Sequence, residues 1–227
     1  MNQLANTEKK NIVEFDADGQ HIKLSRDIVI KQFDPHRKMT DPEINYFIAF
    51  CQARKLNPFT KEVYSIKYKE DTPAQIVVSK DTILKRALAN QNYDGKESGV
   101  IIKNIETGAI EYAQGTYYDK DEYKLVGGWC KVFRKNITRP EFCSVELSEV
   151  NKKQSLWIIS PATMVEKVAK VRALREAFPD DYAGMYDEDE LIIKESENDQ
   201  PVYDPLEATS EVYTAPEQEE VIDIDAL

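Results

Sequence analysis

The feature that most constrains the fold is one long apolar stripe between residues 160 and 178. Ser160 is placed to cap a helix and Pro161 fits its first turn. Apolar residues then recur at spacings of four, three, three and four, which is typical of one helix face. They are Met164, Val168, Val171, Leu174 and Phe178. A stripe of this length predicts a helix packed against the rest of the chain.

The segments before this helix alternate between helical and extended patterns. Thr40-Asp41-Pro42-Glu43 is a capping box that begins a helix, and Pro58 ends it because the residue before proline leaves the α region. Ser25 and Ser79 are expected to begin two further helices, the second with Leu88 on its buried side. The predicted strands are residues 63–69, 75–78, 100–102, 109–117, 129–134 and 142–146. This order predicts an α+β fold, a small antiparallel sheet with packed helices.

Turn residues mark two joints between these elements. Asn92-Tyr93-Asp94-Gly95 is expected to end the third helix in a turn. Gly127-Gly128 is expected to precede the strand that begins at Trp129.

Charge is distributed unevenly along the chain. Residues 179–227 contain 17 acidic residues and one basic residue, whereas residues 1–178 contain 24 acidic and 29 basic ones. The formal net charge of −11 therefore conceals a mildly basic body and a strongly acidic tail. Between Lys131 and Arg175, ten basic residues stand against four acidic ones. Such asymmetry indicates nucleic-acid contact, an interaction tail, or both, and a tail for solubility alone is the alternative.

Composition divides the chain into three segments. Residues 1–22 are polar and expected to be flexible, residues 23–191 form the predicted core, and residues 192–227 are too acidic to fold alone. The three cysteines fit neither a zinc spacing nor a disulfide framework and are expected to be packed, reduced thiols. No apolar run approaches the roughly 20 residues of a membrane helix, and no signal peptide is recognised. A cytoplasmic protein without membrane contact is expected.

The hairpin of residues 129–146 has two interpretations. Alternation puts Lys131 and Phe133 on one strand face and Cys130, Val132 and Arg134 on the other. A cation beside an aromatic ring suits a phosphate and a stacked base. The alternative is an edge strand that lysines protect from aggregation.

Arg175 also has two interpretations, because it projects within the apolar stripe of the last helix. An arginine in that position must find an anion or reach solvent along its stem. A phosphate suits the guanidinium fork, and a carboxylate of the core is the alternative.

Enzymatic signatures are scarce. The sequence contains no G-x-x-x-x-G-K-[ST] and no G-x-S-x-G, and its two histidines lie in polar N-terminal segments. A metal-dependent nuclease would need carboxylates that converge. Asp81, Asp94, Glu97 and Glu149 are available, but their spacing does not bring them together.

Short motifs are spread across residues 40–191. They are Leu56-Asn57-Pro58-Phe59-Thr60-Lys61-Glu62-Val63-Tyr64, Val77-Val78, Tyr93-Asp94-Gly95, Phe133-Arg134-Lys135, Trp157 before Ser160-Pro161, Met164, Ala169, Arg175-Glu176-Ala177-Phe178 and Gly184-Met185-Tyr186-Asp187-Glu188-Asp189-Glu190. In this order the motifs resemble those of the phage recombination protein family called Bet or RecT. Each motif is weak alone, and together they are specific.

The resemblance implies an ATP-independent protein that anneals complementary single DNA strands. Family members form rings or helical filaments that hold single-stranded DNA in a positively charged groove and retain the annealed duplex intermediate. No cofactor is required, and Mg²⁺ is expected only to modulate annealing. A phage exonuclease and a host single-strand-binding protein are partners of some members, and the bacterial cytoplasm is the implied location. The alternatives are a metal-dependent DNA nuclease and a plain single-strand-binding protein that slows pairing.

Carried over by position, Lys61, Lys135 and Arg175 match cations of the family motifs, and Trp157 matches an aromatic residue near the groove. The candidate DNA-binding residues are Lys61, Lys131, Phe133, Arg134, Lys135, Arg139, Lys152, Lys153, Trp157, Lys170, Arg172 and Arg175. Ala162 and Val168 depart from the family, since some relatives have lysine there. The acidic tail is expected to compete with DNA for the groove or to bind a partner.

Overall fold

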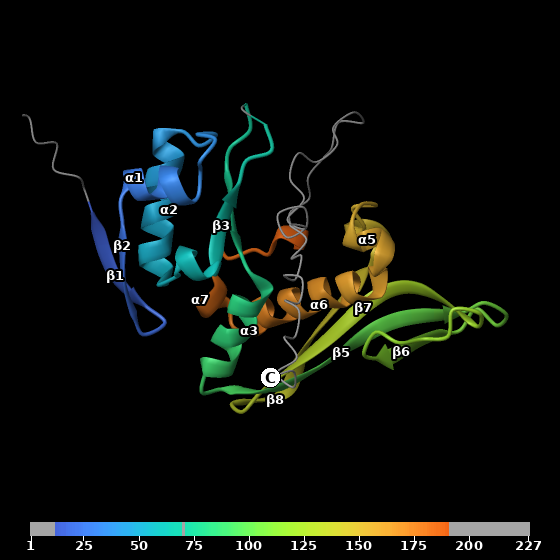
Figure 1. The fold of residues 1–227 in the computed structure, drawn as a ribbon. Helices are drawn as coiled ribbons and strands as arrows, with labels where there is room; N and C mark the ends of the chain where they lie inside the picture. Colours follow the sequence, from blue (N-terminus) through green and yellow to red (C-terminus); the bar gives the residue numbers. More distant parts are fainter. Residues whose placement is uncertain (1–11, 70, 191–227) are drawn as a thin grey trace, which may run out of the picture. The chain divides into compact units, whose positions relative to one another are not determined.

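The computed structural model describes residues 12–69 and 71–190, and these residues have the predicted α+β class (Figure 1). The chain divides into two units, residues 1–194 and 195–227, and the described residues all belong to the first. The predicted acidic tail, residues 192–227, lies outside the described residues. No helix within the described ranges is long and apolar enough to cross a membrane.

A four-stranded antiparallel sheet in the order β6-β5-β7-β8 forms the centre, and two hairpins, β1–β2 and β3–β4, accompany it. The strands are β1 Val13–Ala17, β2 Gln20–Leu24, β3 Val63–Ile66, β4 Gln75–Val78, β5 Tyr93–Asn104, β6 Ile110–Gln114, β7 Tyr123–Arg134 and β8 Ile137–Glu146. The helices are α1 Arg26–Gln32, α2 Asp41–Arg54, α3 Lys80–Ala89, α4 Leu147–Val150, α5 Leu156–Ile159, α6 Pro161–Ala177 and α7 Pro179–Tyr182, with 3-10 turns η1 Pro58–Thr60 and η2 Glu188–Glu190.

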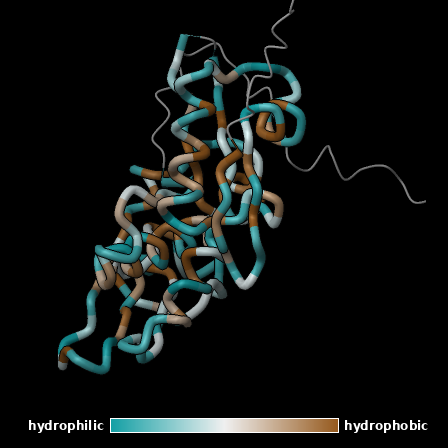
Figure 2. The backbone as a smooth tube through the Cα atoms, turned by 90° about the vertical axis from the view of Figure 1, so that its left-hand side faces the viewer, coloured by the Kyte–Doolittle hydropathy of each residue, from teal (hydrophilic) through white to brown (hydrophobic). Residues whose placement is uncertain are grey.

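Helix α6 lies along one face of the sheet, and its predicted apolar stripe is confirmed (Figure 1). All five residues of the stripe are at most 7 % exposed. Val165, Ala169 and Ala173 of the same helix are also fully buried, because α6 packs against α3 as well as the sheet. Figure 2 shows the apolar residues concentrated where the elements pack against one another.

Two glycines of β7 allow close approach of backbones, Gly128 to α6 and Gly127 to β8. A Cβ atom on Gly128 would lie 2.6 Å from the carbonyl oxygen of Val165, and one on Gly127 would lie 2.5 Å from that of Val145. The prediction that these glycines precede a strand is wrong, since both lie inside β7. In a sequence, a glycine pair is typical of a turn. Here the two glycines lie within a strand, where the absence of a side chain lets neighbouring backbones approach closely.

The predicted helix starts are confirmed by their hydrogen bonds. The Ser25 and Ser79 hydroxyls accept from the amides of Ile28 and Thr82, at 3.3 and 3.2 Å. At α2 the Thr40 amide donates to Glu43 Oε2 at 2.7 Å, as a capping box requires. The prediction for Leu88 is wrong, because its side chain is 66 % exposed.

The predicted flexibility of residues 1–22 is corrected for residues 13–22, which form most of the β1–β2 hairpin. Asp18 and Gly19 connect the strands with φ angles of 52° and 72°. This Asp-Gly pair with positive φ at both positions is typical of a two-residue hairpin turn. Ile22 and Leu24 are buried, so the hairpin contributes to the core.

The predicted turn after α3 is confirmed only at Asn92, which forms it with Gln91, and is wrong for residues 93–95, because Tyr93 begins β5 and pairs with Arg134. The strand register shifts between Tyr93 and Lys96, and Gly95 there has a φ of 109°. The turn-forming residues therefore make a bulge inside a long strand.

Candidate nucleic-acid interface

The β7–β8 hairpin presents the predicted cation beside aromatic rings. Cys130 and Val132 are buried toward α6, while Lys131 and Phe133 are half-buried on the opposite face. The Lys131 ammonium lies 5.6 Å from the centroid of the Trp129 ring. The alternation predicted from the sequence is therefore confirmed.

Arg134 is engaged inside the fold. Its guanidinium donates to the carbonyl oxygen of Ala177 at 2.7 Å and lies 6.0 Å from the centroid of the Phe178 ring. It thus binds a carbonyl at the end of α6, where a cation also complements the helix dipole. The structure gives this predicted DNA contact a role in packing.

Four predicted cations have exposed side chains: Lys61, Lys135, Lys153 and Arg139. Lys135 lies in the β7–β8 turn and Arg139 follows in β8. Lys61 and Lys153 have φ angles of 59° and 56°, at the end of η1 and just before α5. Within residues 12–69 and 71–190 none of the four forms an ion pair. We call these four residues the exposed cations.

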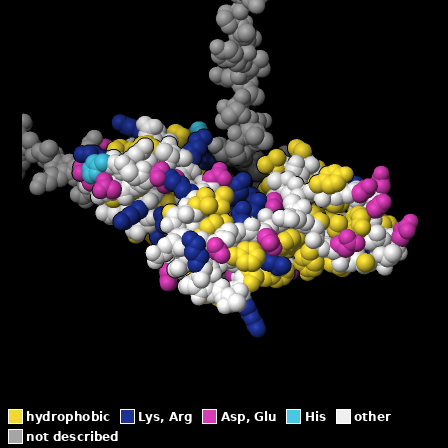
Figure 3. Space-filling view, turned by 90° about the horizontal axis from the view of Figure 1, so that it is seen from below, with side chains coloured by type: hydrophobic (Ala, Val, Ile, Leu, Met, Phe, Trp, Pro, Cys, Tyr) yellow, Lys and Arg dark blue, Asp and Glu magenta, His cyan; other side chains and the backbone are white. Residues whose placement is uncertain are grey.

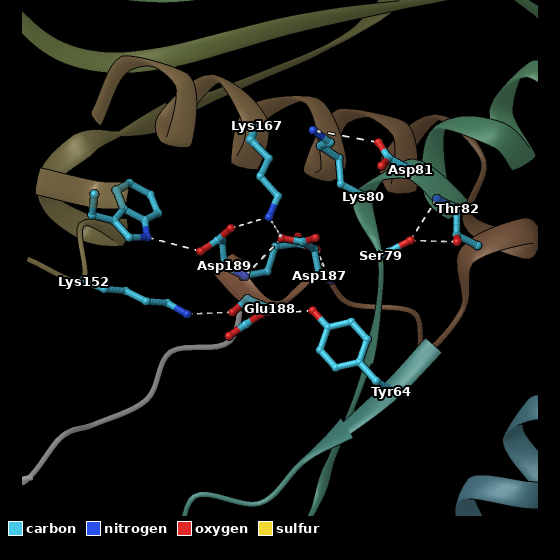
Figure 4. A network of polar contacts seen from close by, with 12 residues as sticks. Tyr64, Ser79, Lys80, Asp81, Thr82, Lys152, Lys167, Asp187, Glu188 and Asp189 are labelled. Atoms are coloured by element: carbon cyan, nitrogen blue, oxygen red, sulfur yellow. Dashed lines mark hydrogen bonds and ion pairs between the residues drawn. The ribbon is translucent and has the colours of Figure 1, made fainter. Parts of the chain in front are cut away.

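Four consecutive acidic residues, Asp187 to Glu190, lie against other cations of the fold, and we call them the acidic segment. Figure 4 shows Lys167 of α6 pointing at Asp187 and Asp189. Its ammonium is 2.8 Å from Asp187 Oδ1 and also bridges to the Asp189 carboxylate. Burial opposes the charge of Lys167, but the two carboxylates outweigh burial and raise its pKa above the usual value.

The acidic segment also binds residues of α5, its preceding connector and β3. Lys152 donates to the carbonyl oxygen of Glu188 at 2.7 Å, and Tyr64 donates to the Glu188 carboxylate at 3.0 Å (Figure 4). Trp157, at 3 % exposure, donates from its indole to Asp189 Oδ1 at 3.2 Å. Burial, with the Glu188 charge as a further cause, raises the pKa of Tyr64. Two predicted DNA contacts, Lys152 and Trp157, therefore hold the acidic segment.

Arg175 pairs with a carboxylate, which was the second of its two interpretations. Its Nη1 lies 2.7 Å from Glu190 Oε1, although the angle between the groups is unsuitable for a hydrogen bond. The guanidinium also lies 4.4 Å from the centroid of the Tyr186 ring. Burial raises the pKa of Glu190, against the opposing effect of Arg175. Together Lys152, Lys167 and Arg175 form a second group, which we call the clamped cations.

The remaining predicted contacts on α6 differ from each other. Lys170 is 3.0 Å from Glu166 Oε2, and Glu166 in turn accepts from Ser98 of β5 at 2.8 Å. Arg172 is half-buried.

Sequence reasoning left Lys167 and Tyr64 out of the predicted site and gave the acidic segment no partner. A signal was present: four consecutive acids follow a basic helix within the core. Such a run pairs readily with buried cations of its own chain.

The carboxylates of the acidic segment converge on cations. Asp187 and Asp189 both contact the Lys167 ammonium, and Glu190 contacts Arg175. Across residues 12–69 and 71–190, no group of three or more His, Cys, Asp or Glu is arranged to hold a metal ion.

Comparison with known families is consistent with these features. The model of the RecT family matches residues 20–204, which include nearly all of the described core. The comparison with curated proteins finds no match. The family match covers most of the chain, including both groups of cations, and the family acts by single-strand annealing in phage recombination. The chain belongs to the RecT family.

Proposed function

We propose that the protein anneals complementary DNA strands without ATP, as an oligomer that holds single-stranded DNA by its backbone. The observation that carries this proposal is the family match over residues 20–204. Annealing breaks and makes no covalent bond. It needs phosphate neutralisation, so that two polyanions can meet, and base edges that stay free to pair.

The exposed cations are the proposed first contacts with phosphate. Lys61, Lys135, Lys153 and Arg139 present their charges to solvent, so binding a phosphate costs them no existing ion pair. Each clamped cation would first have to release its partner in the acidic segment, which is a carboxylate for Lys167 and Arg175 and the Glu188 carbonyl oxygen for Lys152. We therefore assign Lys152 and Arg175, with Trp157, to holding the fold around the DNA-binding surface. Arg172 remains a proposed phosphate contact.

An annealing assay tests the function. Wild-type protein is mixed with two complementary oligonucleotides, one of them end-labelled, with Mg²⁺ and without ATP. The expected product is duplex of full length, formed faster than without protein. Shortened strands would indicate the nuclease alternative, and slower pairing would indicate a plain single-strand-binding protein.

Partner proteins enter this proposal through the acidic tail. A phage exonuclease and a host single-strand-binding protein are the proposed partners, and residues 192–227 are the proposed contact or a competitor of DNA. A chain that ends at Leu191 should bind DNA more tightly at low salt if the tail competes. Unchanged affinity would refute competition.

A further inference from the structure

Two apolar patches on opposite sides of the sheet are left without a partner in the described residues. The first, the helix-side patch, consists of Tyr117, Ile158 and Ile159. Trp157 anchors the single turn α5 in the core, whereas Ile158 and Ile159 are 68 % and 75 % exposed. Tyr117 is 86 % exposed and lines, together with Ile159, a hollow of about 410 Å³ at the start of α6.

The second, the sheet-side patch, consists of Ile110, Tyr112 and Phe142 on the face of the sheet that α6 leaves open. Tyr112 and Phe142 are 55 % and 44 % exposed, with ring centroids 6.2 Å apart. The Trp129 ring lies beneath them, 6.3 Å from that of Tyr112. Figure 3, which views the molecule from below, shows hydrophobic side chains gathered over this face of the sheet.

Charge around the sheet-side patch is of both signs. Glu97 is the cross-strand partner of Lys131, and Lys103 is the partner of both Ile110 and Lys124. Cross-strand partners share a face, so these charged side chains lie around the patch on the same side as Lys131. An apolar centre within a polar rim is typical of a protein interface.

The size and shape of the patches favour a second copy of this chain. Each patch exposes on the order of 400 Å² of apolar side chain, about half of what one partner contributes to a stable interface and a suitable apolar centre for it. The sheet-side patch presents two aromatic rings, and the helix-side patch presents aliphatic side chains beside a hollow. Two different, complementary patches on opposite sides of a molecule make a head-to-tail contact, which continues into rings or filaments.

We propose that the helix-side patch of one copy docks on the sheet-side patch of the next. The proposal rests on the oligomer of the proposed function and names its interface. The same contact is repeated between all copies, and the exposed cations of successive subunits follow one another along the assembly.

Mixing two assembly variants tests this geometry. Ile158→Asp/Ile159→Asp removes the helix-side patch, and Tyr112→Asp/Phe142→Ser removes the sheet-side patch. Leu88→Asp, an equally exposed aliphatic position on α3, is the matched control. Each variant is examined alone and in a one-to-one mixture by light scattering after size exclusion, with circular dichroism to establish folding.

The expected result is that wild type and the Leu88 variant assemble, and that each patch variant alone is a monomer. The mixture should form dimers and nothing larger, because each variant keeps the one patch that the other lacks. Three results would overturn the interface: a monomeric wild type, large assemblies of either patch variant, or a mixture that stays monomeric with both variants folded. Binding of a short labelled single strand is measured in parallel. If the wild-type protein does not bind this strand, the proposed function is contradicted. If a monomeric variant still binds it, contact with DNA does not depend on assembly.

Discussion

The clamped cations and the exposed cations have the same charge but opposite surroundings. Lys167 lies between two carboxylates of the acidic segment, whose Asp187 is almost fully buried, whereas Lys135 and Arg139 face solvent at the β7–β8 turn. A buried cation that loses its partner costs several kcal/mol, but an exposed one loses little. Charge near a candidate groove therefore does not by itself identify a DNA contact, and its existing partner must be known.

The largest effect is expected from Asp187→Ala. The substitution removes one of the two carboxylates of Lys167 in a nearly dry site, and the free energy of unfolding should fall by about 3 kcal/mol. Urea denaturation measures it. Asp81→Ala is the control, because Asp81 has an 87 % exposed side chain 3.9 Å from Lys80 (Figure 4). A loss for Asp187→Ala as small as the control's would show that the clamp contributes nothing to stability.

Arg175→Ala should have the next largest effect, again on stability. It leaves the Glu190 carboxylate, 3 % exposed, without its cation, so we expect a loss of about 2 kcal/mol in the free energy of unfolding. Adding Glu190→Gln should recover part of this loss, because no buried charge then remains. The opposite result would be an Arg175→Ala protein that folds normally but binds DNA more weakly and with less dependence on salt. That result would show that Arg175 contacts DNA.

Removing exposed cations should affect DNA and leave the fold unchanged. In Lys135→Gln/Arg139→Gln the affinity for single-stranded DNA should fall by roughly tenfold. The slope of log affinity against log salt should decrease by about 1.4, since each phosphate contact on a single strand contributes about 0.7. Fluorescence anisotropy over a salt series measures both quantities. An unchanged slope would exclude these two residues from the phosphate contacts.

What the sequence could predict was what local patterns determine. The capping box at Thr40, the stripe of α6 and the alternation of Lys131 and Phe133 each depend on residues close in the chain, and the structure confirms them. The glycine pair at 127–128 was misread because its cause is tertiary, the close approach of Gly128 to α6 and of Gly127 to β8.

The site was predicted less well, because ion pairs join distant residues. Arg175 could be limited to two kinds of anion, but Glu190 as its partner depends on how the chain returns after α7. Tyr64 and Glu188, 124 residues apart, could not be paired from spacing. The exposed cations are recognisable only after every other cation has been given its partner.

The smallest expected effect is a dependence of stability on pH, and its sign differs between two carboxylates that bind cations, Glu43 and Glu190. Glu43 accepts from the Thr40 and Ala74 amides and from Lys67, at 2.7, 2.8 and 2.9 Å. Burial alone would raise its pKa, but these hydrogen bonds outweigh burial and lower the pKa from 4.5 to about 2. Because the folded pKa is below the unfolded one, the stabilisation from Glu43 is complete above pH 4.5 and is lost as the pH falls toward 2.

Glu190 should respond with the opposite sign, since burial raises its pKa in the folded protein. Its protonated form suits the fold better, so its contribution to stability increases as the pH falls toward 4.5. Thermal unfolding of wild type, Glu43→Gln and Glu190→Gln between pH 2 and pH 6 measures both effects. The Glu43→Gln protein should lose less stability than wild type on acidification, and the Glu190→Gln protein should lose more. Parallel curves for all three proteins would mean that folding changes the pKa of neither Glu43 nor Glu190. The surroundings of these two carboxylates would then not determine how stability responds to acid.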